Sequence, residues 1–147
     1  MGSGAAEVTA VLPASSAQAR AVVMALLESR CRSTGVDWPA DVVIADVLLV
    51  TSELVTNADR HGGGLTLFTA AVEGDALHLR VGDANPAHPV SPPAPTVPAG
   101  APRIGGYGWQ MVHRLAHTVE VTNHSAGKTI FAVVRLYGDS LDEGGPP

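Results

Sequence analysis

Two long stretches of the chain place apolar residues at the three- and four-residue spacing of an amphipathic helix. The first, residues 16–32, follows Ser15 and Ser16, either of which can cap a helix, and Gly35 lies just beyond its end. The second, residues 39–61, begins at a proline, which suits a first turn, and stops at three consecutive glycines. Its apolar stripe consists of Val43, Val47, Val50 and Leu54. Both stretches are therefore predicted to be helices that turn one face toward a core.

Shorter stretches of alternating or apolar residues, bounded by turn residues, predict strands and one further helix. The strands are expected at residues 7–12, 65–72, 76–81, 118–122 and 129–136, and the helix at residues 109–116. This order mixes helices and hairpins without strict alternation of strand and helix. It predicts an α+β fold, a two-layer α/β sandwich in which the helices cover one face of a mixed, mostly antiparallel sheet.

Residues 86–102 form a segment of a different kind. The segment holds seven of the eleven prolines and contains no Asp, Glu, Lys or Arg. A long loop without regular structure inside a compact domain is usually functional or disordered. We therefore expect this segment to act as a mobile lid.

Composition and charge narrow the class of protein. A chain of 147 residues suits one domain, which we place at residues 7–137, with flexible tails at 1–6 and 138–147. Cys31 is the only cysteine, and a cytoplasmic protein is the simplest interpretation. The net charge is −5 without any basic run, which argues against direct binding to nucleic acid. No signal-peptide pattern and no apolar stretch of membrane-spanning length are visible, so no membrane association is expected.

A polar line runs beside the apolar stripe of the second helix. Glu53, Asn57 and His61 recur at four-residue spacing and therefore lie along one side of the helix. A carboxylate and an amide oxygen one turn apart suit Mg²⁺ or a water in its shell, and the glutamate can take a proton from an attacking hydroxyl. Spacing alone also fits an ordinary solvated helix face.

Three other segments carry candidate site residues. Asp83 follows a strand, where its carboxylate can accept a hydrogen bond from an exocyclic amine or simply stabilise a turn. Gly106 and Gly108 open a helix whose free N–H groups attract phosphate, although glycines here also fit a flexible loop. Thr129 lies in the run GKT at the start of the last strand, which by itself fits a plain hairpin turn.

Taken together and in this order, these segments resemble the nucleotide-binding boxes of the GHKL (Bergerat-fold) ATPase superfamily. The likeness lies in residues 53–61 (ELVTNADRH), 81–86 (VGDANP), 105–112 (GGYGWQMV) and 127–134 (GKTIFAVV). It extends over about residues 10–136 and is strongest to the short, single-domain anti-sigma-factor serine/threonine kinases of bacteria. The Bergerat fold is a two-layer sandwich of the kind predicted above.

The resemblance implies a role for each residue of the polar line. Asn57 would be a ligand of Mg²⁺. Glu53 would be the catalytic base or would orient a water bound to Mg²⁺. His61 would lie near the phosphates of the nucleotide.

The resemblance also assigns roles outside that helix. Asp83 would receive the amino group of adenine, and Thr129 would support the base directly or through water. Gly106 and Gly108 would let the lid and the helix end approach the phosphates of ATP.

Two departures from the family pattern concern catalysis. Tyr107 and Trp109 stand where an arginine and a leucine are common, so Arg103 or Arg60 must supply charge to the γ-phosphate, or phosphoryl transfer is weakened. Asn85 stands in place of a glycine that often follows the aspartate. ATP binding is still expected with these departures, whereas they weaken the case for catalysis.

The implied function is that of an ATP-binding regulatory protein with ATP and Mg²⁺ as cofactors. It would phosphorylate an anti-sigma-factor antagonist and control a sigma factor by partner switching, and a homodimer is a further expectation. The alternative is a non-catalytic module that binds ATP or ADP and regulates a partner protein. A detached histidine-kinase catalytic domain fits less well, because the short chain shows no dimerisation helix with a phosphorylatable histidine. Zinc is disfavoured because His113 and His117 lack a third ligand nearby in the sequence.

Overall fold

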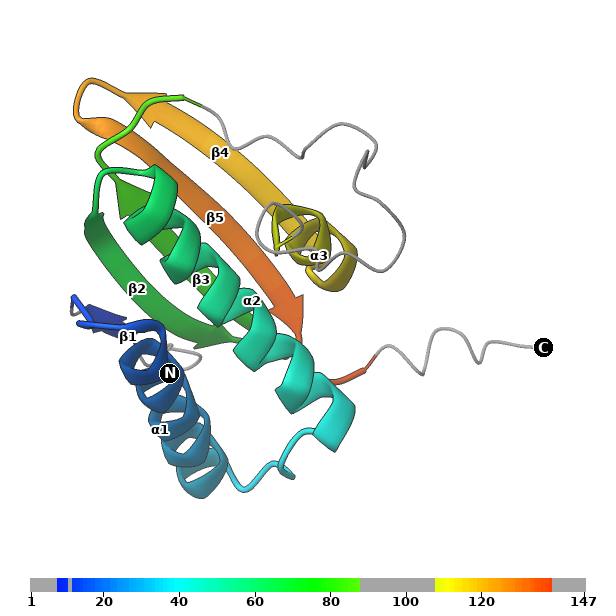
Figure 1. The fold of residues 1–147 in the computed structure, drawn as a ribbon. Helices are drawn as coiled ribbons and strands as arrows, with labels where there is room; N and C mark the ends of the chain where they lie inside the picture. The colour runs from blue at the N-terminus through cyan, green and yellow to red at the C-terminus, as the bar shows by residue number, and fades with distance from the viewer. Residues whose placement is uncertain (1–7, 11, 88–107, 139–147) are drawn as a thin grey trace, which may run out of the picture.

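The structure is a computed structural model that describes residues 8–10, 12–87 and 108–138. Its elements follow one another in the predicted order (Figure 1). The helices are α1 (Ser16–Thr34), α2 (Asp41–His61) and α3 (Gly108–Leu115). The strands are β1 (Val8–Ala10), β2 (Leu65–Glu73), β3 (Ala76–Asp83), β4 (Thr118–His124) and β5 (Gly127–Arg135). Most of the predicted lid, and the predicted tails apart from Gly138, lie outside the described residues.

The five described strands form one sheet in the order β1-β2-β3-β5-β4. Every pairing among them is antiparallel, so the sheet is antiparallel throughout its described part rather than mixed. The short strand β1 lies at one edge of the sheet. In the centre, β3 pairs with β5, and this places the end of β3 beside the start of β5.

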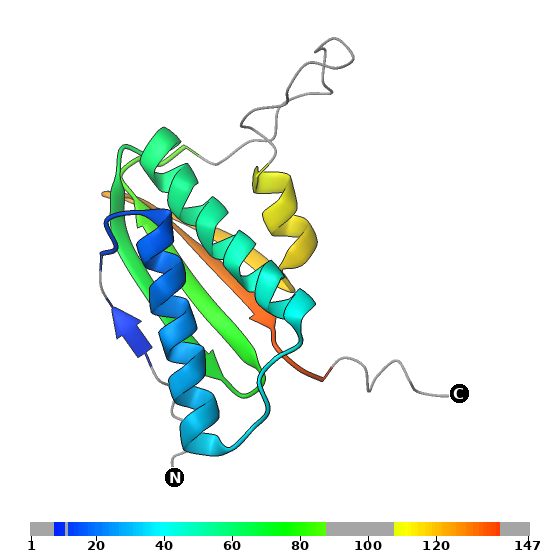
Figure 2. The same ribbon diagram turned by 60° about the horizontal axis from the view of Figure 1, so that its bottom comes forward.

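The three described helices all lie on one face of this sheet, which confirms the predicted α+β sandwich (Figure 2). Ser15 caps α1, because its hydroxyl oxygen accepts a hydrogen bond from the backbone N–H of Gln18 at 3.1 Å. Gly35 ends the same helix in the left-handed conformation, with φ of 77°. None of the described helices has the length and apolarity needed to cross a membrane.

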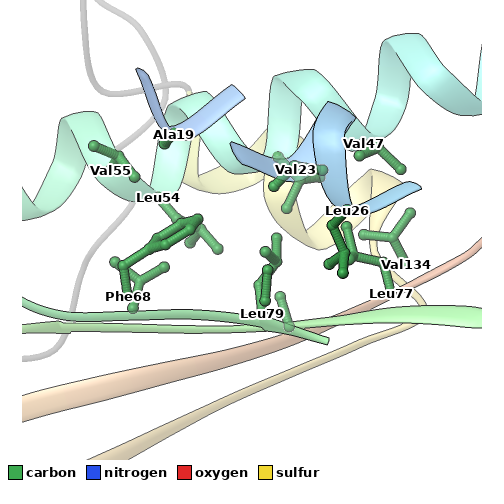
Figure 3. Close-up of a cluster of buried hydrophobic side chains, with 14 of the residues drawn as sticks. Ala19, Val23, Leu26, Val47, Leu54, Val55, Phe68, Leu77, Leu79 and Val134 are labelled. Carbon is green, nitrogen blue, oxygen red and sulfur yellow. The ribbon is translucent and has the colours of Figure 1, made fainter. Parts of the chain in front are cut away.

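The core lies between the helix layer and the sheet (Figure 3). Alternate residues of the strands point into it, as a period of two requires, and α1 and α2 contribute their apolar stripes. The largest fully buried side chains include Phe68, Leu77 and Leu79 from the sheet and Leu54 from α2. On the opposite face of the sheet, the guanidinium of Arg80 lies over the ring of Phe131, 4.6 Å from its centroid.

Replacing Leu54 by Ala tests the packing of α2 on the sheet. Leu54 has no exposed surface, so the variant should lose about 2–5 kcal/mol of unfolding free energy through lost burial and a residual cavity. Val42 lies on the same helix with 67% of its surface exposed, and Val42→Ala should change stability by less than about 0.5 kcal/mol. Urea unfolding followed by circular dichroism measures both values, and equal losses would contradict the described core.

Candidate functional site

The polar line of α2 begins at the edge of the core and ends in solvent. Glu53 and Asn57 are half-buried, and His61, the last residue of α2, is exposed. Leu54 and Ala58, each next to one of these residues in sequence, are fully buried in the core. Within the described part of the chain, the side chain of Asn57 makes no hydrogen bond.

The N-terminus of α3 lies directly against Glu53. A Cβ atom built on Gly108, the first residue of α3, would lie only 1.7 Å from Oε1 of Glu53. No side chain could occupy that position without displacing the carboxylate. The positive end of a helix dipole stabilises an anionic group placed there. The fold therefore brings the proposed base and a predicted phosphate-binding glycine into contact.

Asp83 lies at the other end of the polar line, where α2 stops. It is the last residue of β3 and is 3% exposed. A Cβ atom on Gly62, which follows α2, would lie 2.4 Å from Cγ of Asp83. Two hydrogen bonds tie the same segments together: Ala84 N–H donates to Gly62 O at 2.9 Å, and the Asn85 side-chain amide donates to His61 O at 2.8 Å. The backbone end of α2 is thereby held against the carboxylate of Asp83.

Lys128 forms a buried ion pair with Asp83, and the sequence had assigned no role to this lysine. Its Nζ lies 2.8 Å from Oδ2 and 3.0 Å from Oδ1 of Asp83. The two side chains expose only 5% and 4% of their surfaces. The antiparallel register places Lys128 directly opposite Asp83, although Asp83 precedes it by 45 residues in the chain. No local pattern in the sequence signals such a pairing, because it depends on that register.

Thr129 lies away from this cluster. Directly paired residues of an antiparallel sheet share a face, and neighbours along a strand alternate. Thr129 pairs with Gly82, whereas Asp83 pairs with Lys128, so the side chain of Thr129 lies on the face opposite Asp83. Its hydroxyl lies 3.2 Å from Nε2 of His124. The structure therefore does not bring the side chain of Thr129 together with that of Asp83, the residue predicted to bind the amino group of adenine.

The remaining predicted residues are Arg103 and Gly106, which lie outside the described residues, and Arg60, which is exposed on α2. The site that the described part of the chain assembles thus consists of Glu53, Asn57, His61, Asp83 and Gly108, with Gly62 and Lys128 as added members. It extends along the C-terminal half of α2, with a glycine packed against each carboxylate and the Lys128 side chain paired with Asp83.

A small hollow of about 120 Å³ lies at the far end of the sheet and is separate from this site. Its lining includes Cys31, Asp75 and Tyr137, near the start of β3, whereas Asp83 ends that strand. Burial and the contact with Cys31 raise the pKa of Tyr137 to about 12. The hydroxyl of Tyr137 donates a hydrogen bond to Asp37 O at 2.6 Å, which suits a structural role for this group.

Comparisons with known proteins agree with this fold. The sequence model of the histidine kinase-like ATPase domain matches residues 10–134. Among solved structures, the RsbU and RsbW domains of Rv1364c from Mycobacterium tuberculosis are similar, with a TM-score of 0.54 and 21% sequence identity. The match covers 88% of this chain and 32% of that one, so this chain spans about a third of the matched structure. Among curated proteins, none matches the chain significantly.

Replacing Gly108 by Ala tests the contact between α3 and Glu53. At a helix terminus free of contacts, Ala in place of Gly usually stabilises slightly, by up to about 1 kcal/mol. Here the added methyl group would meet the end of the flexible, half-buried Glu53 side chain, which must move aside, so we expect this gain to be cancelled or reversed by up to about 1 kcal/mol.

The double variant Glu53→Ala/Gly108→Ala serves as the control, because it removes the atoms that the methyl group would meet. It should recover about 0.5–3 kcal/mol relative to the sum of the two single changes, measured by chemical denaturation. Additive effects, or a Gly108→Ala protein more stable than the parent, would show that the two groups are not in contact.

Proposed function

Because this chain belongs to the histidine kinase-like ATPase domain family, we propose that it binds ATP with Mg²⁺ and acts as an anti-sigma-factor serine/threonine kinase. Its substrate would be a Ser or Thr hydroxyl of a small anti-sigma-factor antagonist. Phosphorylation would prevent the antagonist from binding, and the kinase would then hold a sigma factor instead. The domain responsible would span residues 7–137.

The observation that carries the proposal is the convergence of separate chain segments along α2. Gly108 lies against Glu53, and Gly62 holds Asp83 at the end of the same helix. At each of these contacts a glycine without a Cβ atom lets the backbone approach a carboxylate closely. A polar line beside a buried stripe, flanked by a helix N-terminus, is an arrangement that suits Mg-nucleotide.

Each residue takes a role that its position supports. Asn57, half-buried and without a described partner, would ligate Mg²⁺, and His61 would lie near the phosphates. Asp83 would accept a hydrogen bond from the amino group of adenine. Gly106 and Gly108 would approach the phosphates from the lid side, with Arg103 or Arg60 as the cation for the γ-phosphate. We leave Thr129 out of the adenine contact, because its side chain lies on the other face of the sheet.

The proposed reaction places Glu53 as the base. The oxygen of the substrate hydroxyl would attack the γ-phosphorus, and its proton would pass to the Glu53 carboxylate. The bond between the γ-phosphorus and the bridging oxygen would break, and ADP would leave. The positive end of α3 beside Glu53 would also attract the charge that builds up on the phosphoryl oxygens.

The partners follow from the kinase proposal rather than from the fold. The similar structure contains an RsbW domain, which is consistent with an anti-sigma-factor antagonist and a sigma factor as partners. The net charge of −5 gives no support to direct binding of nucleic acid. We propose action in the cytoplasm, with homodimer formation to be tested by sedimentation.

A second candidate function is regulation by nucleotide binding without phosphoryl transfer. Tyr107 stands where an arginine is common in the kinases, and residues 86–102 carry no Lys or Arg. A site with less positive charge stabilises the transferring phosphoryl group less. Such a protein would bind ATP or ADP and alter its affinity for a partner.

Asn57→Ala tests the metal role. Removal of the amide oxygen should abolish the part of ATP affinity that depends on Mg²⁺, as measured by calorimetry with and without the ion. Asp59→Ala is the matched control, because Asp59 is exposed on the same helix but off the polar line. Unchanged Mg²⁺-dependent affinity in Asn57→Ala would remove this residue from the site.

Glu53→Ala tests the catalytic role. With labelled ATP, Mg²⁺ and an antagonist protein, the parent should place label on a Ser or Thr, and the variant should transfer it about 10²–10⁴-fold more slowly. The variant should still bind ATP, because Glu53 acts on the substrate hydroxyl. Tight ATP binding by the parent with no transfer to any antagonist would favour the non-catalytic module.

A further inference from the structure

The ion pair between Lys128 and Asp83 occupies the carboxylate that the proposed function needs for adenine. Lys128 Nζ contacts Oδ1 and Oδ2 of Asp83 at 3.0 and 2.8 Å and donates to Asn85 O at 3.0 Å. A lysine ammonium has three N–H donors, and three acceptors surround it here. The ammonium is therefore fully satisfied in this buried position.

The other sides of the Asp83 carboxylate are also in contact with protein. The Asn85 backbone N–H donates to Oδ1 at 2.9 Å. A Cβ atom on Gly62 would lie 2.4–2.6 Å from the side chain of Asp83, so the backbone there is packed against it. A Cβ atom on Gly127 would lie 1.9 Å from Asp83 O, so the start of β5 closes the main-chain side. Among the described residues, Lys128 covers the part of the carboxylate that these contacts leave open.

A ligand amino group and the Lys128 ammonium compete for the same acceptor. Both are N–H donors, and both need lone pairs of the Asp83 carboxylate, which Lys128 and the Asn85 N–H already engage. We propose that Lys128 is an internal occupant of the adenine subsite, and that adenine binds at Asp83 only after the ammonium has moved away. This inference rests on the proposed binding of ATP and adds a closed state to it.

The closed state lowers the apparent affinity for ATP. If the open form is a small fraction of the protein, the measured dissociation constant is the intrinsic one divided by that fraction. The flexible four-carbon stem of lysine allows the ammonium to leave while the strand stays paired. A neutral residue at position 128 removes the competitor and leaves the strand pairing intact.

The sequence provides a direct probe, because Lys128 is the only lysine in the chain. Acylation by an amine-reactive ester, followed by peptide mass spectrometry, reports on this one side-chain ammonium. Saturating ATP should raise the rate of acylation of Lys128 about tenfold or more, because the ammonium then loses its buried charge-assisted contact with Asp83 and becomes accessible to the ester. Inosine triphosphate, which carries a carbonyl in place of the amino group, should leave Lys128 protected.

Variants give an independent reading of the same competition. Lys128→Met and Lys128→Gln should bind ATP about tenfold more tightly than the parent, which is the scale of one charge-assisted contact, and should gain little for inosine triphosphate. Arg80→Met is the matched control, since it removes a cation from the same pair of strands on the open face of the sheet. Circular dichroism establishes that each variant is folded.

The outcomes separate this inference from the proposed function. ATP binding with Lys128 still protected, or equal affinity in the folded Lys128 variants and the parent, would overturn the competition while leaving nucleotide binding intact. Tight binding in a Lys128 variant with none in the parent would support a closed parent site. No ATP binding by the parent or by the folded Lys128 variants would refute the proposed function itself, and the inference with it.

Discussion

The burial of the apolar side of α2 against the sheet is the constraint on which the site depends. Val47, Val50 and Leu54 have no exposed surface, so the helix cannot rotate about its axis without opening the core. That same orientation fixes Glu53 and Asn57 at the rim, half-buried beside the stripe. The position of the polar line is thus a consequence of packing, and the energy that holds it comes from the core.

At two places along this helix, a glycine lets the backbone pack closely against a carboxylate of the proposed ligand site. Gly108 and Gly62 bring α3 and the end of α2 against two carboxylates at distances that no Cβ atom would allow. One of these carboxylates, Asp83, also serves stability through its buried pair with Lys128. Removing one partner of such a pair typically lowers the free energy of unfolding by about 3–5 kcal/mol. The Asp83 carboxylate therefore stabilises the fold when it is paired with Lys128, whereas the proposed binding of adenine requires that this pair be broken.

Much of the architecture could be predicted from the sequence, because the relevant signals are local. The stripe of α2, the cap at Ser15 and the left-handed Gly35 each depend on residues within one or two turns. The antiparallel pairs β2–β3 and β4–β5 are joined by short turns and are local in the same way, whereas the central pair β3–β5 joins strands far apart in the chain. The line of Glu53 and Asn57 was visible for the same reason, since four-residue spacing alone sets the side of a helix.

The sequence by itself therefore determined the elements, their order and the polar line of α2. Only the tertiary structure decided what those elements bring together. The register of β3 and β5 places Lys128 against Asp83 and turns Thr129 to the other face, and a shift by one residue would reverse both. The contact of Gly108 with Glu53 likewise depends on how α3 packs on α2. Periodicity along a chain sets which side of an element a residue faces, whereas contacts between distant segments are set by the packing and pairing of whole elements.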